Sequence, residues 1–117
     1  MFRDDFVWGV ASSAYQIEGR DANDGAGAMI WDKFIAEGGT KDGYGAEVAC
    51  DHMHRYKEDF ALMRLMGIKA YRFSISWARL IPEGTGKVNE KAVALYRDMI
   101  LEMKKNGIEP YLKILNL

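Results

Sequence analysis

The sequence has little cysteine, no long apolar run and no excess of basic residues near its start. Cys50 is the single cysteine among 117 residues, which excludes a disulfide within the chain and removes any need for an oxidising compartment. No stretch approaches the roughly 18 uninterrupted apolar residues of a membrane span. The opening "MFRDDFVWGV" carries Asp4 and Asp5 where a signal peptide needs positive charge. We therefore expect a cytoplasmic location.

The chain also lacks a charge excess of either sign. It has 16 Lys and Arg against 17 Asp and Glu, so electrostatics argue against nucleic acid and against a membrane surface as partners. Metal-ligand spacing is missing too. His52 and His54 are separated by two positions, which do not face each other on a helix, and no third ligand pattern accompanies them. We expect no metal site.

Two segments have the apolar periodicity of helices, and each ends in glycine. They are residues 51–67 and residues 89–107, with Asn89 as a predicted N-cap. In each segment the apolar side chains recur every three or four residues, on one face: Met53, Tyr56, Phe60 and Met63 in the first, and Ala92, Tyr96, Met99 and Met103 in the second. Each segment is predicted to pack this face on a core.

An extended apolar run follows each helix, and the two runs open alike. "GIKAY" begins at Gly67 and "GIEPY" at Gly107, forty residues apart. Repetition of helix, glycine and strand is typical of βα crossovers and predicts a parallel sheet. Residues 6–12 are predicted to form an earlier strand, and residues 29–39 a short helix in the loop that follows it.

This order of elements predicts an incomplete α/β domain. Three strands and two long helices cover only part of a parallel sheet, and the final "YLKILNL" ends on a strand. Natural folds normally protect an apolar edge strand. We therefore expect residues 1–117 to be a fragment of a single larger domain, with self-association through the exposed strand edge as a possible consequence.

The segment "AYRFSISW", residues 70–77, alternates bulky apolar with polar side chains. Its polar set is Arg72, Ser74 and Ser76, and a strand would place these opposite Tyr71, Phe73, Ile75 and Trp77. That polar face is exposed either to water or to the interior of a barrel. Because a buried arginine needs an anion, the second alternative predicts a carboxylate near Arg72.

The segment "SSAYQIEG", residues 12–19, lies just after the first predicted strand. In parallel α/β folds, ligands bind outside the carboxyl ends of the strands. Gln16 could both donate to and accept from a pair of adjacent hydroxyls. The alternative is ordinary loop packing, and the residues alone leave both open.

Taken in order, "DDFVWGVASSAYQIEG", "WDKF", the run from "ACDHMHRYKEDF" to "GTGKVNE" and "GIEPYL" closely resemble the N-terminal part of family 1 glycoside hydrolases, the β-glucosidase family. The resemblance reaches about residue 112. It implies a (β/α)8 TIM barrel, of which this chain would supply about three βα units without closing the barrel. It also implies retaining hydrolysis of β-glucosides, without cofactor or metal.

The resemblance gives roles to single residues. It makes Gln16 a ligand of the nonreducing-end sugar hydroxyls and Arg72 the partner of the glutamate nucleophile. "YQIE" resembles the branch that acts on unphosphorylated sugars. Asn116 stands where the family has a sugar-binding histidine, so its contact with sugar is doubtful.

No catalytic residue is expected in this chain. The family's Asn-Glu-Pro and Glu-Asn-Gly segments, which carry the acid/base and the nucleophile, do not occur in the sequence. Because retaining hydrolysis needs both carboxylates, we expect the 117-residue chain to be inactive alone. The alternatives are a noncatalytic sugar-binding or barrel-complementing fragment and, from another class, a small doubly wound α/β binding domain.

Overall fold

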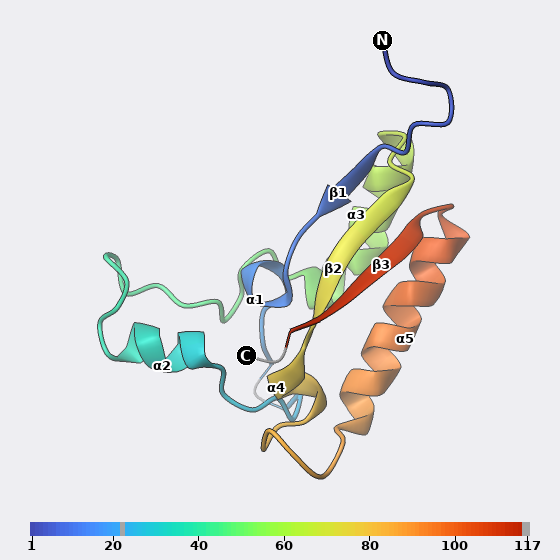
Figure 1. Cartoon of the computed structure of the whole chain (residues 1–117). Coiled ribbons are helices and arrows are strands. Elements are labelled where there is room, and N and C mark those ends of the chain that lie inside the picture. The colour runs from blue at the N-terminus through green and yellow to red at the C-terminus, as the bar shows by residue number, and fades with distance from the viewer. Residues whose placement is uncertain (22, 116–117) are drawn as a thin grey trace.

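A computed structural model describes residues 1–21 and 23–115. Its elements are, in chain order, β1 (Gly9–Ala11), α1 (Ala14–Ile17), α2 (Ile30–Ala36), α3 (His52–Leu65), β2 (Ala70–Ser76), α4 (Trp77–Leu80), α5 (Glu90–Lys105) and β3 (Glu109–Leu115). Figure 1 shows the three strands side by side, with α3 and α5 on one side of the sheet. The short helices α1 and α4 lie at the carboxyl ends of β1 and β2.

The long helices α3 and α5 form where the apolar periodicity predicts them. The Asn89 side chain accepts a hydrogen bond from the Lys91 backbone N–H at 3.2 Å, which confirms the predicted N-cap of α5. Gly67 and Gly107 follow the two helices with φ of 76° and 71°. This left-handed conformation favours glycine, which explains why both helices stop there.

The sheet is parallel, as the repeated helix and strand pattern predicts. Its order is β1-β2-β3, with Ala11 paired to Arg72 in one ladder and Arg72 paired to Tyr111 in the other. The first strand is shorter than the predicted residues 6–12, because only Gly9–Ala11 pair with β2. Within the described residues the sheet is open, so β1 and β3 are both edge strands.

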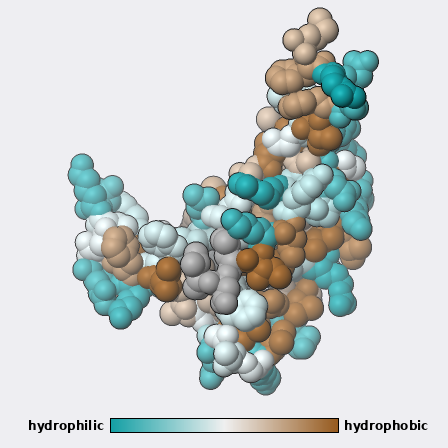
Figure 2. Space-filling view, in the orientation of Figure 1, coloured by the Kyte–Doolittle hydropathy of each residue, from teal (hydrophilic) through white to brown (hydrophobic). Residues whose placement is uncertain are grey.

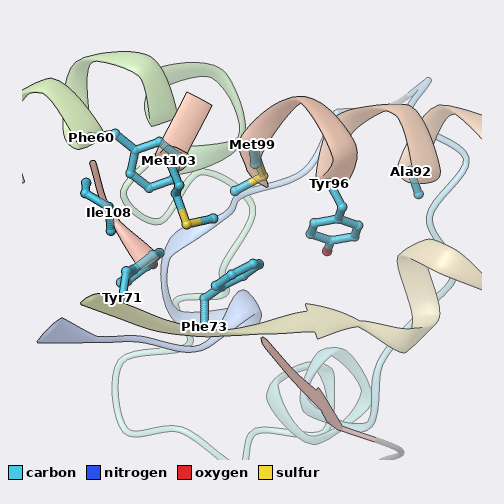
Figure 3. Close-up of a cluster of buried hydrophobic side chains, with 8 residues drawn as sticks. All are labelled: Phe60, Tyr71, Phe73, Ala92, Tyr96, Met99, Met103 and Ile108. Atoms are coloured by element: carbon cyan, nitrogen blue, oxygen red, sulfur yellow. The ribbon is translucent and has the colours of Figure 1, made fainter. Parts of the chain in front are cut away.

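The core lies between β2 and the two long helices. Figure 3 shows the side chains of Tyr71 and Phe73 pointing from β2 toward Tyr96, Met99 and other residues of α5. The Tyr71 and Phe73 rings are stacked, with centroids 5.5 Å apart. The remaining members of the cluster are Phe60, Ala92, Met103 and Ile108. The predicted apolar faces of both helices are therefore the faces that pack.

The strand prediction for residues 70–77 was wrong at its last position. Strand β2 ends at Ser76, and Trp77 begins α4. The Ser76 hydroxyl accepts a hydrogen bond from the Arg79 backbone N–H at 3.2 Å, and this N-cap turns the chain into a helix. The apolar and polar alternation continues through Trp77, so it could not reveal the cap.

Much apolar surface is left uncovered in the described part of the chain. Phe2, Phe6 and Trp8 form an exposed aromatic group whose ring centroids are 4.5–4.9 Å apart. Figure 2 shows hydrophobic residues gathered at this N-terminal end and over the strands. Leu112 and Ile114 of β3 are 44% and 60% exposed. Among the described residues, no helix has both the length and the apolar character that crossing a membrane requires.

Candidate functional site at the carboxyl ends of the strands

The one-turn helix α1 sits directly after β1 and is tied to β2. The Ser12 backbone N–H donates to the carbonyl oxygen of Arg72 at 3.0 Å, which continues the β1–β2 contact past the strand. The Ala14 backbone N–H donates to the Ser74 hydroxyl at 2.8 Å, and both residues are buried. A single helical turn is not stable by itself, so these contacts fix where α1 lies.

Gln16 lies in α1 with its side chain exposed. The Ser13 hydroxyl donates to Gln16 Oε1 at 2.8 Å. This contact uses one acceptor position of the amide, and it leaves the two amide N–H donors and one oxygen lone pair for a ligand. The position after β1 that the sequence predicts for Gln16 is thus confirmed, while its role in binding sugar stays a prediction.

Arg72 is exposed on β2. It alternates with Tyr71 and Phe73, which pack on the helices, so its side chain projects from the opposite face of the sheet. Among the described residues no carboxylate forms an ion pair with it. The predicted anion partner of Arg72 therefore stays a prediction. Ser74 and Ser76, the other members of the polar set, are buried.

A different arginine forms the buried ion pair of this structure. Arg79 of α4 is 4% exposed and donates from Nε to Glu18 Oε2 at 3.2 Å, and Glu18 is itself 4% exposed. The same guanidinium donates to Asp24 at 2.5 Å and to the Gly19 carbonyl oxygen at 2.6 Å. The sequence patterns do not predict this pair, although Glu18 lies in "SSAYQIEG" and Arg79 lies two residues after "AYRFSISW".

Tyr96 completes the environment of the Glu18 carboxylate. Its hydroxyl donates to the two carboxylate oxygens at 2.9 and 3.0 Å and accepts from the Ser76 backbone N–H at 3.0 Å. In Figure 3 the ring of Tyr96 points from α5 toward the end of β2. Burial, reinforced by the Glu18 charge, raises the pKa of Tyr96, so the phenol stays a donor.

The two carboxylates that meet Arg79 titrate differently. Burial raises the pKa of Glu18 even though Arg79 and Tyr96 oppose this shift. Burial also acts to raise the pKa of Asp24. There, the backbone N–H groups of Ala26 and Asp21, together with Arg79, outweigh it and hold the pKa below its ordinary value. Asp24 is therefore the more firmly ionised partner.

A small cavity borders this ion pair. It measures about 20 Å³, and its lining includes Tyr15, Arg20 and Asp32. Arg20 bonds Asp32 at 3.0 Å, which ties the loop before α2 to α2 itself. That volume suits one water molecule and is far too small for a sugar.

The two histidines have separate partners. His52 is buried with Nδ1 2.6 Å from Asp59, while His54 bonds Asp51 and Asp21 at 2.6 and 2.8 Å on the surface. Residues 1–21 and 23–115 contain no cluster of three or more His, Cys, Asp or Glu side chains arranged to hold a metal ion. The doubtful sugar-contact position, Asn116, lies outside the described residues.

The sequence is similar to a known family and to several of its members. Residues 1–116 match glycosyl hydrolase family 1. β-Glucosidase A of Acetivibrio thermocellus is 52% identical over 110 residues, covering 93% of this chain and 25% of that protein. The aryl-phospho-β-D-glucosidase BglC of Bacillus subtilis is 51% identical over 110 residues, covering 93% of the chain and 23% of that protein. The name of the Bacillus subtilis relative refers to phosphorylated substrates. Overall sequence identity therefore does not show whether this chain is of the branch that acts on unphosphorylated sugars or of one that acts on phosphorylated sugars.

Solved structures match the fold over nearly the whole chain. A β-glucosidase from Thermotoga maritima in complex with azafagomine aligns with a TM-score of 0.91 and 48% identity, covering 97% of this chain and 26% of that one. A rice β-glucosidase in covalent complex with Glc aligns with a TM-score of 0.92 and 44% identity, covering 97% and 24%. The expected fold, the first βα units of a TIM barrel, is confirmed. The chain spans about a quarter of the length of the relatives it matches.

Proposed function

The chain belongs to glycosyl hydrolase family 1, and from that membership we propose that it supplies the nonreducing-end sugar contact of a retaining β-glucosidase. The observation that carries this proposal is the exposed, oriented amide of Gln16 at the carboxyl end of a parallel strand. An amide that can both donate and accept suits the adjacent hydroxyls of a glucosyl unit. The relatives' names support β-glucosides as the substrate class.

Arg72 has the second role in the proposal. Its guanidinium projects from the sheet face opposite α3 and α5, which in a closed barrel is the inner face. There it holds the nucleophilic glutamate in its ionised form, since a nearby opposite charge lowers a carboxyl pKa. The 117 residues include neither the Asn-Glu-Pro nor the Glu-Asn-Gly segment. Both catalytic carboxylates must then come from outside residues 1–117.

Three further assignments belong to the same proposal. The "YQIE" segment favours unphosphorylated sugars, because it offers no positive charge beside Gln16. Two carboxylates suffice for retaining hydrolysis, so the reaction needs neither cofactor nor metal. The single cysteine, which is exposed, suits a reducing cytoplasm.

A fusion protein tests the proposal. Residues 1–112, which leave out Asn116, replace the corresponding N-terminal part of the Thermotoga maritima β-glucosidase, which supplies the rest of the barrel. We expect the fusion to hydrolyse an aryl β-glucoside and the 117-residue chain alone to be inactive. A fusion that folds cooperatively but has no hydrolytic activity would contradict the proposal, as would turnover by the isolated chain.

Arg72→Met in the fusion tests the second role. General acid–base and nucleophilic steps depend on ionisation states, so we expect kcat to fall by at least about tenfold and the acid limb of the pH–rate profile to move to higher pH. Arg97→Met is the matched control, because Arg97 is exposed on α5. An unchanged pH–rate profile in Arg72→Met would show that Arg72 does not control the ionisation of the nucleophile.

A barrel-complementing role is the second candidate, favoured by the open sheet. Both β1 and β3 are edge strands in the described residues, and Leu112 and Ile114 are exposed beside the β3 edge. Such an edge pairs with another chain, either the missing part of a barrel or a second copy. Sedimentation of the chain alone, and after mixing with the separately produced remainder of the Thermotoga enzyme, distinguishes these cases. A monomer under both conditions excludes the role.

A further inference from the structure

The turn that carries Gln16 ends in a buried carboxylate, which is an unusual residue for that place. Glu18 directly follows α1, and its backbone N–H donates to the Ala14 carbonyl oxygen at 3.0 Å. Its carboxylate is held by Arg79 of α4 and Tyr96 of α5, and its carbonyl oxygen accepts from the Met53 backbone N–H at 3.1 Å. Glu18 therefore docks α1 onto three other helices at once.

The start of the same turn controls the direction of the amide. Ser13 precedes α1, and its side chain makes no capping bond to the helix backbone. Its hydroxyl donates instead to Gln16 Oε1 at 2.8 Å. An amide can present either its oxygen or its nitrogen to a ligand, and this bond turns the nitrogen side outward. Serine at this position is thus occupied with orienting Gln16 rather than with capping.

We propose that Ser13 and Glu18 are positioning residues for Gln16, with Glu18 fixing the place of the helical turn and Ser13 fixing the orientation of the amide. The inference rests on the proposed function for its purpose, since a fixed amide matters only if Gln16 binds sugar. Preorganisation then lowers the ordering cost of binding. The substrate contact is made by Gln16 alone, and the other two residues act through it.

Gln16 is the only glutamine in the sequence, which gives a direct readout. Labelling the chain with side-chain 15N-glutamine yields one amide signal, and its two proton shifts and its 15N heteronuclear NOE report orientation and mobility. In the wild-type chain we expect resolved, immobile amide protons. In Ser13→Ala the oriented population falls by roughly fivefold, as expected for one lost hydrogen bond. Ser13→Thr keeps the hydroxyl and restores the wild-type signal.

The role of Glu18 is tested with Glu18→Met, because this substitution does not add a second glutamine to the sequence. We expect mobile amide protons at Gln16 and backbone exchange at residues 14–18 faster by about 10- to 100-fold, because a charge-assisted bond is lost. Tyr96→Phe removes only the hydroxyl that holds Glu18, and it gives the same change in smaller size if Glu18→Met does not fold. Glu102→Met on α5, away from α1, is the matched control and leaves the signal unchanged.

The outcomes separate the two proposals. A wild-type amide with the shifts and mobility of free glutamine overturns the positioning role, whatever the rest of the chain does. So does a Ser13→Ala signal equal to that of wild type, or a Tyr96→Phe signal equal to that of Glu102→Met. Failure of Gln16 to contact sugar in the fusion leaves these signals unchanged and counts only against the proposed function.

Discussion

Replacing Arg79 by methionine is expected to lower the unfolding free energy of the chain by about 3–5 kcal/mol. The side chain is 4% exposed and donates to Glu18, Asp24 and the Gly19 carbonyl oxygen. Methionine retains much of the volume and none of these bonds. The Glu18 carboxylate is then buried with Tyr96 as its remaining side-chain donor, and an uncompensated buried charge accounts for most of the loss.

The pH dependence distinguishes this cause from lost packing. Burial raises the pKa of Glu18 in the folded chain above its ordinary value of 4.5, and removal of Arg79 raises it further. A raised folded pKa means that stability is fully present below the unfolded pKa and is lost as pH rises through the folded one. The deficit of Arg79→Met relative to wild type is therefore smaller at about pH 5 than at about pH 8.

Urea denaturation of both chains at the two pH values, followed by tryptophan fluorescence, measures this difference. Arg97→Met, an exposed arginine on α5, is the control and is expected to change stability by less than about 0.5 kcal/mol. An Arg79→Met deficit that does not depend on pH, or one no larger than that of the control, would refute the reasoning.

The other predictions concern single contacts, each measured by urea or thermal denaturation. Gly19→Ala is expected to destabilise by about 1–3 kcal/mol, because φ is +76° and the new Cβ would lie 2.5 Å from the Val48 carbonyl oxygen; Gly38→Ala, with a similar φ and open space around it, must cost less. Met99→Ala should cost about 2–5 kcal/mol through a core cavity, so a loss as small as that of the exposed Leu101→Ala would contradict the packing described. Hydrogen bonds to Asp51 and Asp21 raise the pKa of His54 above 6.5, so its stabilisation is present below that pH and is lost as pH rises through the folded pKa. His54→Asn should reduce this change of the unfolding free energy with pH, and an unaltered pH dependence would mean that another group causes it.

Most of the fold could be predicted from local patterns. Helices α3 and α5 each place one apolar stripe on the core, and their glycine stops open two similar strands. These signals lie within a few residues of each other and need no tertiary contact. The boundary at Ser76 was missed because a capping hydroxyl looks like any other polar residue of an alternating strand. The sequence does not predict how short β1 is, because the strand ends where its pairing with β2 ends and not where the composition changes.

The site could be predicted only where a single segment carries it. Gln16 after β1 was found from the segment in which it lies. The ion pair between Glu18 and Arg79 joins residues 61 positions apart, and a sequence with 17 acidic and 16 basic residues offers many such pairs. Only the parallel order of β1 and β2 brings these two together. The weak signal available was an arginine with apolar neighbours on both sides in "WARL".

The most direct test of the central claim is Gln16→Ala in the fusion of residues 1–112 with the rest of the Thermotoga maritima barrel. If Gln16 binds the nonreducing-end sugar, kcat/KM for an aryl β-glucoside falls by at least about tenfold while the melting temperature stays unchanged, because an exposed side chain with lost substrate hydrogen bonds affects binding and not folding. An unchanged kcat/KM in a stable fusion would contradict the assignment.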